Sequence, residues 1–232
     1  MIGHSRMYGR EGTMGVTRTE MKIVKAGREH AGFLAWVMLT AHRSHLERGL
    51  WDFIVGGSEA ECLRYLEALA VTEQAHWAHY STFIVAEVDG RPAAALCGYS
   101  EAEHGTPSLV SGMADANRVV GRSEEEHATG WQRAGSIAHV APEHMPGAWI
   151  VENVATAPEY RRRGLVDRLL VEILGKGRER AATIADIGVL IGNDPAQRAY
   201  EKAGFEVTGE KRHPEFEAVY RCPGIRSLSL NL

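Results

Sequence analysis

Residues 148–191 constrain the fold of this chain more than any other part of the sequence. Residues 148–156 are a mostly apolar run of strand length, and a short turn separates them from residues 165–174, where apolar pairs recur at helical spacing. Residues 184–191 are apolar almost throughout, which is typical of a strand covered on both faces. The order strand, amphipathic helix, buried strand predicts a sheet with helices on its faces.

Further elements extend this pattern toward both ends of the chain. Asp89 and Gly90 form a two-residue turn signal between two apolar runs, which predicts a hairpin, and Ser58 with Glu61 forms a capping box at a helix start. The predicted strands are residues 21–26, 82–88, 92–99, 148–156, 184–191, 205–207 and 216–221. The predicted helices are residues 28–48, 58–79, 165–174 and 194–204. We therefore expect an α/β fold with a central mixed β-sheet flanked by helices, built as a single domain over residues 21–232.

Residues 100–146 interrupt the pattern just before the fourth predicted strand. They carry seven acidic and three basic side chains, which gives −4, together with Gly, Pro and Ser and only scattered apolar residues. We expect an acidic insertion that is partly helical and mobile by composition. Four apolar residues would let it dock on the rest of the domain: Val119, Val120, Trp131 and Ile137.

The composition excludes several classes of protein. Hydrophobic residues make up 44% of the chain and charged residues 24%, which is ordinary for a globular protein. The net charge of −4 argues against a general nucleic-acid binder, which would carry a basic surplus. The longest uncharged apolar run, residues 31–40, is too short to cross a bilayer.

The N-terminal segment and the cysteines bear on the cellular location of the protein. Residues 1–20 show no periodicity, and we interpret them as a mobile arm without the apolar segment of a signal peptide. The three cysteines are widely spaced and are interpreted as reduced thiols. These features predict a cytoplasmic protein with no nucleic-acid and no membrane partner, and they leave a homodimer open.

The turn before the amphipathic helix has the features of a phosphate site. Val154–Val166 reads VATAPEYRRRGLV, so three arginines and a glycine stand between a strand and a helix. A helix start presents free N–H groups and the positive end of the helix dipole, and Gly164 lets a ligand approach the backbone closely. A pyrophosphate fits such a turn. A solvated basic turn with a helix-stop glycine is the alternative that this segment alone leaves open.

A second segment, Asn193–Phe205, reads NDPAQRAYEKAGF. With the arginine turn, it resembles the GNAT N-acetyltransferase superfamily, which transfers acetyl from acetyl-CoA to an amine. The family's pyrophosphate motif, Gln/Arg-x-x-Gly-x-Gly/Ala, is matched by Arg161, Arg162, Arg163, Gly164 and Leu165. Its second motif is matched by Asn193, Ala196, Tyr200, Lys202, Gly204 and Phe205. The clear resemblance covers roughly residues 148–207.

The resemblance implies a GNAT-like fold and a set of coenzyme contacts. Residues 161–166 would bind the pyrophosphate. The backbone of Val154, Ala155 and Thr156 would pair with the pantetheine arm, and Asn193 would hydrogen-bond the same arm. Val166 departs from the motif, which has Gly or Ala there, and its β-branch is expected to crowd the phosphate. The long insertion is a second departure, since the family usually has a short loop there.

Two residues are predicted to carry the chemistry. Tyr200 stands where the resemblance places the acid that protonates the leaving thiolate, and Glu152, on the strand before the turn, could accept the amine proton. The alternatives are that Tyr200 belongs to the core, that Glu152 pairs with an arginine on the sheet, and that Asn193 is a loop residue before an Asp194 cap.

Histidines suggest a competing site. His42 and His45 are three residues apart on one predicted helix, and His76 and His79 are three apart on the next, so four imidazoles could bind a metal if the helices were neighbours. Because no carboxylate or thiol reinforces the pattern, surface and helix-end histidines are favoured, and we expect no metal.

Taken together, the residues favour transfer of acetyl from acetyl-CoA to a primary amine on a small molecule or peptide. The −4 of the insertion favours a cationic acceptor: a small amine, a polyamine-like molecule or a basic peptide end. The alternative is a GNAT-fold module that binds acetyl-CoA or a partner without turnover.

Overall fold

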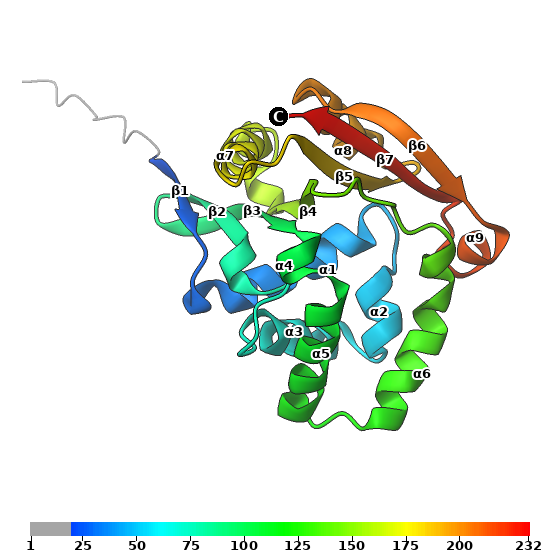
Figure 1. The fold of residues 1–232 in the computed structure, drawn as a ribbon. Coiled ribbons are helices and arrows are strands. Elements are labelled where there is room, and N and C mark those ends of the chain that lie inside the picture. Colours follow the sequence, from blue (N-terminus) through cyan, green and yellow to red (C-terminus); the bar gives the residue numbers. More distant parts are fainter. Residues whose placement is uncertain (1–19) are drawn as a thin grey trace, which may run out of the picture.

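The computed structural model describes residues 20–232, so all but the last residue of the predicted arm lies outside the described part. The described residues form a seven-stranded sheet with the order β1-β2-β3-β4-β5-β7-β6 (Figure 1). β4 and β5 are parallel, and the other neighbouring pairs are antiparallel. The strands are β1 (Met21–Lys25), β2 (Phe83–Val88), β3 (Arg91–Ser100), β4 (Trp149–Thr156), β5 (Ile184–Leu190), β6 (Glu206–Arg212) and β7 (Gly224–Asn231). The predicted mixed sheet with flanking helices is confirmed.

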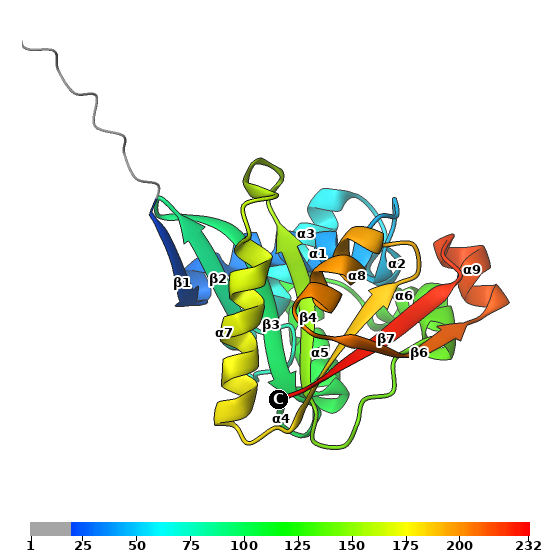
Figure 2. The ribbon, with the colours of Figure 1, turned by 90° about the horizontal axis from the view of Figure 1, so that it is seen from above.

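Helices cover both faces of the sheet (Figure 2). α7 (Leu165–Glu179) and α8 (Asp194–Lys202) pack on one face, where the buried leucine pairs of α7 meet Leu96 and Val151 of the sheet. α1 (Ala31–Arg43) packs on the other face, and α3 (Glu59–Ala70) packs against α1. The remaining helices are α2 (Leu50–Val55), α4 (Glu101–His104), α5 (Thr106–Val120), α6 (Glu124–Ala134) and α9 (Pro214–Tyr220), with 3-10 turns η1 (Arg28–His30), η2 (Tyr80–Thr82), η3 (Gly135–His139) and η4 (Pro158–Tyr160). In the described part of the chain, no helix combines the length and apolar character needed to cross a membrane.

Two predicted helices end earlier than their sequence pattern indicates. The first stops at Arg43, because Ser44 has a left-handed φ of 56°. The second stops at Ala70, where the Thr72 hydroxyl donates to the backbone oxygens of Leu69 (3.3 Å) and Gln74 (3.0 Å). A side chain that bonds its own backbone in this way competes with the helical ladder.

The strand predicted at residues 216–221 is wrong, because this segment belongs to helix α9. Pro214 stands in its first turn, where a missing N–H has no cost, and the His213 side chain caps the helix by accepting a backbone N–H. Phe216 and Tyr220 lie one turn apart, are both buried and stack at 4.4 Å between ring centroids. The strand that closes the sheet is β7, which follows α9.

The insertion, residues 100–146, forms α4, α5 and α6, so its predicted partial helicity is confirmed. It is attached to the short helix α2 through carbonyls at that helix's C-terminal end. Arg133 Nε donates to the oxygen of Phe53 (2.9 Å), and Arg122 Nη2 donates to that of Ile54 (3.0 Å). Cations are favourable at a helix C-terminus, so these two arginines attach the insertion firmly to α2 despite its polar composition.

The residues expected to dock the insertion do so with one exception. Val120, Trp131 and Ile137 pack against the core cluster that α1 and α3 share. Val119 is 76% exposed, so its predicted docking role is wrong. The prediction failed there because successive helical residues point in different directions.

The contact between α6 and α2 predicts a loss of stability in Gly130→Ala. A Cβ at Gly130 would lie 2.0 Å from the Ile54 backbone oxygen, so one helix must shift. We expect unfolding free energy to fall by about 2 kcal/mol or more, even after the better helix propensity of alanine. Denaturant titration measures this. Gly135→Ala is the matched control, because that site has αR geometry and open space, and equal stability of both variants would contradict the close approach.

Candidate active site

A cleft opens where β4 and β5 separate. Backbone pairing between the two parallel strands ends at Val151 opposite Ile187. Beyond this point β4 remains paired with β3, while no strand of residues 20–232 pairs with the edge that faces β5. A free strand edge offers N–H and C=O groups to an extended ligand, which would pair with it like an added strand.

A bulge in β4 bends the strand at this position. Ala155 lies opposite Ala95 and Glu152 opposite Cys97, so two residues of β4 face one of β3. Asn153, within the bulge, has a left-handed φ of 56°, which asparagine tolerates better than most residues. Its Nδ2 donates to Cys97 Sγ at 3.4 Å. Its Oδ1 is buried and meets no described donor in good hydrogen-bond geometry, although Asn153 lies close enough to His42 to raise the pKa of that imidazole against the larger effect of burial.

The cleft has a volume of about 580 Å³ and brings together residues from both predicted motifs. The predicted site residues that line it are Glu152, Val154, Ala155, Thr156, Arg161, Asn193 and Tyr200. The others, Arg162, Arg163, Gly164, Leu165 and Val166, continue the chain from Arg161 into α7 and do not line the cleft itself. One cleft therefore joins the β4 edge, the arginine turn and α8.

Glu152 is a half-buried carboxylate on the cleft side of β4. Burial raises its pKa to about 7, against a hydrogen bond with the Tyr99 phenol that lowers it, and the Glu101 carboxylate adds a smaller upward shift. No arginine among the described residues contributes to this pKa shift. The alternative that Glu152 pairs with an arginine on the sheet therefore has no support. A carboxyl with a pKa near neutrality can accept a proton at physiological pH.

Tyr200 belongs both to the core and to the cleft. Only 6% of the residue is exposed, and its ring meets Phe205 edge-on with centroids 6.4 Å apart. The same residue lines the cleft. Burial raises the pKa of the phenol above its ordinary value, so it stays protonated at neutral pH and can donate.

Asn193 is the cap of α8, and the predicted Asp194 cap is wrong. Asn193 Oδ1 accepts the backbone N–H of Ala196 at 3.3 Å, and Nδ2 donates to Ser44 Oγ at 2.6 Å. Asp194 is instead the first residue of the helix. One N–H of the Asn193 amide remains for a ligand.

The backbone of the arginine turn is shaped as an open cradle. Gly164 has φ 73° and caps α7 without a side-chain bond, and Arg162 has φ 63°. A Cβ at Gly164 would meet only Asp167 Oδ2, at 3.9 Å, so the space beside the glycine is open. The first N–H groups of α7 lack helical partners, as at any helix start.

The side chains around the cradle lie in three surroundings: the cleft, the solvent and the core. Arg161 Nε donates to the Thr156 oxygen at 3.4 Å and lies at the cleft, while Arg163 is exposed and covers the Tyr160 ring at 5.2 Å. Leu165 is buried, and Val166 packs against the same core cluster. The β-branch of Val166 thus packs in the core, which leaves the backbone groups of the turn clear of it.

The histidine arrangement predicted on two helices is wrong. His76 and His79 follow the end of α3 and lie in a loop, where His76 Nε2 bonds Thr72 Oγ1 at 2.9 Å and His79 Nδ1 bonds Ser81 Oγ at 2.7 Å. His42 does line the cleft, and burial lowers its pKa to about 4, so it is neutral.

Several cleft residues were not predicted from the sequence. Tyr99 and Asn153 lie next to Glu152, and Glu101 and His144 come from the two ends of the insertion. An asparagine in the middle of a predicted strand is a sequence signal that could have indicated the bulge, because asparagine tolerates a left-handed φ. No local pattern marks the ends of the insertion as neighbours of β4.

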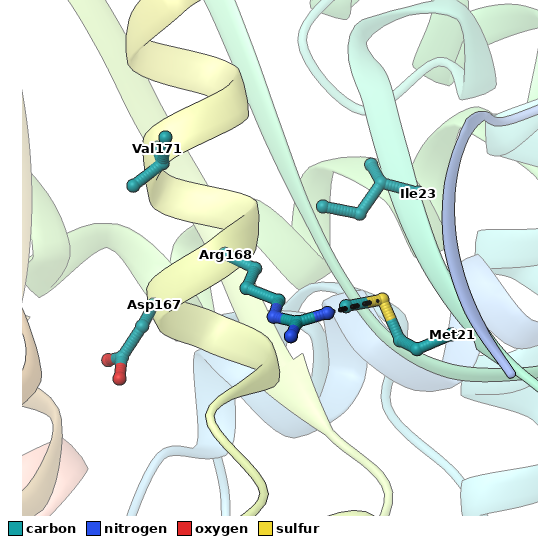
Figure 3. A pocket seen from close by; sticks show the side chains of 5 residues that line it. All are labelled: Met21, Ile23, Asp167, Arg168 and Val171. Atoms are coloured by element: carbon teal, nitrogen blue, oxygen red, sulfur yellow. Dashed lines mark hydrogen bonds between the residues drawn. The ribbon is translucent and has the colours of Figure 1, made fainter. Parts of the chain in front are cut away.

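A second hollow, of about 480 Å³, lies between β1 and α7 (Figure 3). Arg168 reaches across it, with Nη1 3.9 Å from Met21 Sδ, and Val171 forms an apolar rim. Its one lining carboxylate, Asp167, pairs with Lys202 at 2.5 Å. The Asp167 carboxylate is thus already ion-paired, whereas Glu152 in the larger cleft forms no ion pair with a described residue.

The comparisons with known proteins agree with this geometry. A family model described as the acetyltransferase (GNAT) family matches residues 51–205. No curated protein matches the sequence.

Solved structures resemble the whole domain. A structure described as an acetyltransferase has a TM-score of 0.66 at 14% identity, and covers 90% of this chain and 98% of its own. An N-acetyltransferase from Staphylococcus aureus Mu50 has a TM-score of 0.62 at 18% identity, covering 90% and 100%. The polyamine N-acetyltransferase of Drosophila melanogaster has a TM-score of 0.53 at 18% identity, covering 92% and 100%. At these identities the likeness concerns the fold alone.

Proposed function

The chain belongs to the GNAT acetyltransferase family, and on that premise we propose that it transfers the acetyl group of acetyl-CoA to a primary amine. The observation that carries the proposal is the cleft between β4 and β5, which joins a free strand edge, Glu152 and Tyr200. A module that only binds the coenzyme has no need of an acid and a base in one cleft. The two roles favour turnover over binding alone.

Acetyl-CoA fits the residues present. The free edge of β4, from Glu152 to Thr156, would hold the pantetheine arm by backbone hydrogen bonds, and Asn193 has one N–H left for it. The open cradle at Gly164 and the exposed arginines would hold the pyrophosphate. When bound, acetyl-CoA would supply the thioester acetyl group.

The chain's own groups then handle two protons. The Glu152 carboxylate accepts one from the acceptor ammonium, whose ordinary pKa is about 10.4, directly or through water. The Tyr200 phenol supplies one to the departing sulfur, whose conjugate thiol has a pKa of about 8.5. Backbone N–H groups at the β4 edge polarise the acetyl carbonyl. We also propose a cytoplasmic location, in keeping with three buried, unpaired cysteines.

Titration calorimetry with acetyl-CoA, together with free-thiol release in the presence of amines, tests the function. We expect binding of acetyl-CoA and amine-dependent release of thiol. Gly164→Asp should weaken acetyl-CoA binding by roughly 10-fold or more, because it sets a carboxylate beside the pyrophosphate.

Gly121→Asp is the matched control for backbone strain. Gly121 has φ 75° and open space like Gly164, but it caps α5 away from the cleft. Equal affinity in both variants would show that the arginine turn does not bind phosphate. Coenzyme binding without thiol release for any amine would favour the non-catalytic module.

A further inference from the structure

Six aromatic side chains, besides Tyr200, line the cleft, and we call them its aromatic wall. They come from α2, the loop before β2, β3, α6 and α9, and they are Trp51, Trp77, Tyr99, Trp131, Phe216 and Tyr220. The ring centroids of Trp51 and Trp77 lie 5.9 Å apart, and those of Trp77 and Tyr99 lie 6.5 Å apart in a stacked arrangement. Aromatic surface of this kind accommodates a broad apolar body.

The aromatic wall adjoins the proposed base. Tyr99 stands on β3 two residues beyond Cys97, which lies opposite Glu152, and both Tyr99 and Glu152 line the cleft, so the wall begins near the carboxylate. An ammonium is a donor only, and the Glu152 carboxylate is an acceptor for it there.

The charged groups of the cleft select against an anionic acceptor. Glu101 and Glu152 line the cleft. Arg161 is the one arginine among the described lining residues, and it bonds Thr156 at the end assigned to the coenzyme. His42 is neutral because burial lowers its pKa. His144 lies 3.5 Å from the Asp186 carboxylate. An acceptor carboxylate would meet like charge and no free cation.

The cleft also disfavours a second cation far from Glu152. The described lining holds no carboxylate besides Glu101 and Glu152: aliphatic side chains (Leu50, Ile54, Leu109, Ile137 and Ile225) and a few hydroxyls accompany the aromatic wall. A second ammonium placed there would be buried without a negatively charged partner, which is costly. An extended polyamine therefore fits worse than a single amine.

We propose that the acceptor is a monoamine: one primary amine on an aromatic or similarly broad apolar body that carries no carboxylate. This rests on the proposed function and names the acceptor class of that site. The amine lies at Glu152, and the body lies against the aromatic wall.

Three probes separate the acceptor classes: phenethylamine, free phenylalanine and spermidine. Phenethylamine and phenylalanine differ by one carboxylate, so their kcat/KM ratio isolates the charge effect. We expect phenethylamine to exceed each of the others by roughly 100-fold in kcat/KM, as like-charge contact and burial of an unpaired cation would cause. Preference for spermidine or phenylalanine would overturn the inference while leaving acetyl transfer in place.

Two variants test the residues involved. Trp131→Ala should raise KM for phenethylamine about 10-fold and leave KM for acetyl-CoA unchanged. Trp36→Ala is its control, since Trp36 is a half-buried tryptophan on α1 that does not line the cleft. Glu101→Gln keeps an oxygen that can accept the Thr106 N–H, and should reduce discrimination against phenylalanine at least 5-fold. Unchanged constants in both would contradict the assignment.

A binding measurement separates this inference from the proposed function. Amine titrations are followed by the fluorescence of the five tryptophans, three of which, Trp51, Trp77 and Trp131, line the cleft. Binding of phenethylamine, roughly 10-fold or more tighter than phenylalanine and spermidine, without any turnover would preserve the acceptor class and refute acetyl transfer. Absence of phenethylamine binding with turnover of another amine would do the reverse.

Discussion

Replacing Tyr200 with phenylalanine is expected to lower kcat about 100-fold while acetyl-CoA binding changes little. The phenol is the proton donor proposed for the departing sulfur, and burial keeps it protonated by raising its pKa. Phenylalanine retains the ring that packs against Phe205, so the fold should be preserved. Steady-state kinetics with calorimetry measures both quantities.

Tyr65→Phe is the matched control for the loss of a buried tyrosine hydroxyl. Tyr65 is 1% exposed, its hydroxyl has no partner and it does not line the cleft. We expect unchanged kcat in that variant. If Tyr200→Phe behaved in the same way at every pH, Tyr200 would be a core residue and the protonation of sulfur would need another source.

Glu152→Gln is expected to reduce kcat/KM by roughly 100-fold at pH 8 and to change the pH profile. Because burial raises the pKa of Glu152 to about 7, the carboxylate form grows as pH rises through that value. The rate of the unaltered protein should therefore rise across this interval. The glutamine variant should lack that step, since its side chain does not titrate.

Glu87→Gln serves as the control for the same substitution on the same sheet. Glu87 lies on β2, has a side chain that is 23% exposed and bonds His30, outside the cleft. Its variant should keep the step near pH 7. Persistence of that step in Glu152→Gln as well, with a rate within about threefold, would remove Glu152 from the mechanism.

The insertion bears on the acceptor differently from what its net charge indicates. Glu103 pairs with Arg180 at 2.6 Å and Glu143 pairs with Lys211 at 2.8 Å, so these acids are partly compensated. Among the described lining residues, Glu101 is the insertion's one acid at the cleft. The attraction for a cation that the net charge predicts for the whole insertion therefore comes mainly from Glu101. Trp131, also from the insertion, contributes apolar surface to the same cleft.

The sequence alone was sufficient for the features that depend on near neighbours. The helix after the arginine turn follows from leucine pairs three to four residues apart, which bury one face. The place of Gly164 at the start of that helix follows from the motif, whereas its φ of 73° is seen only in the structure. Glu152 and Tyr200 were predicted because one precedes the turn on its strand and the other lies in the second motif, and both line the cleft.

The tertiary structure decided what depends on distant residues. Local preference did not distinguish a strand from a helix at residues 214–220, where burial of Phe216 and Tyr220 on one face selects the helix. Arg122 meets the Ile54 oxygen across 68 residues of sequence, and this contact places the insertion beside the cleft. The separation of β4 from β5 depends on a bulge whose register is set by β3. Packing and pairing between remote segments have no signature in local periodicity, so the cleft and its aromatic wall were visible only in the folded chain.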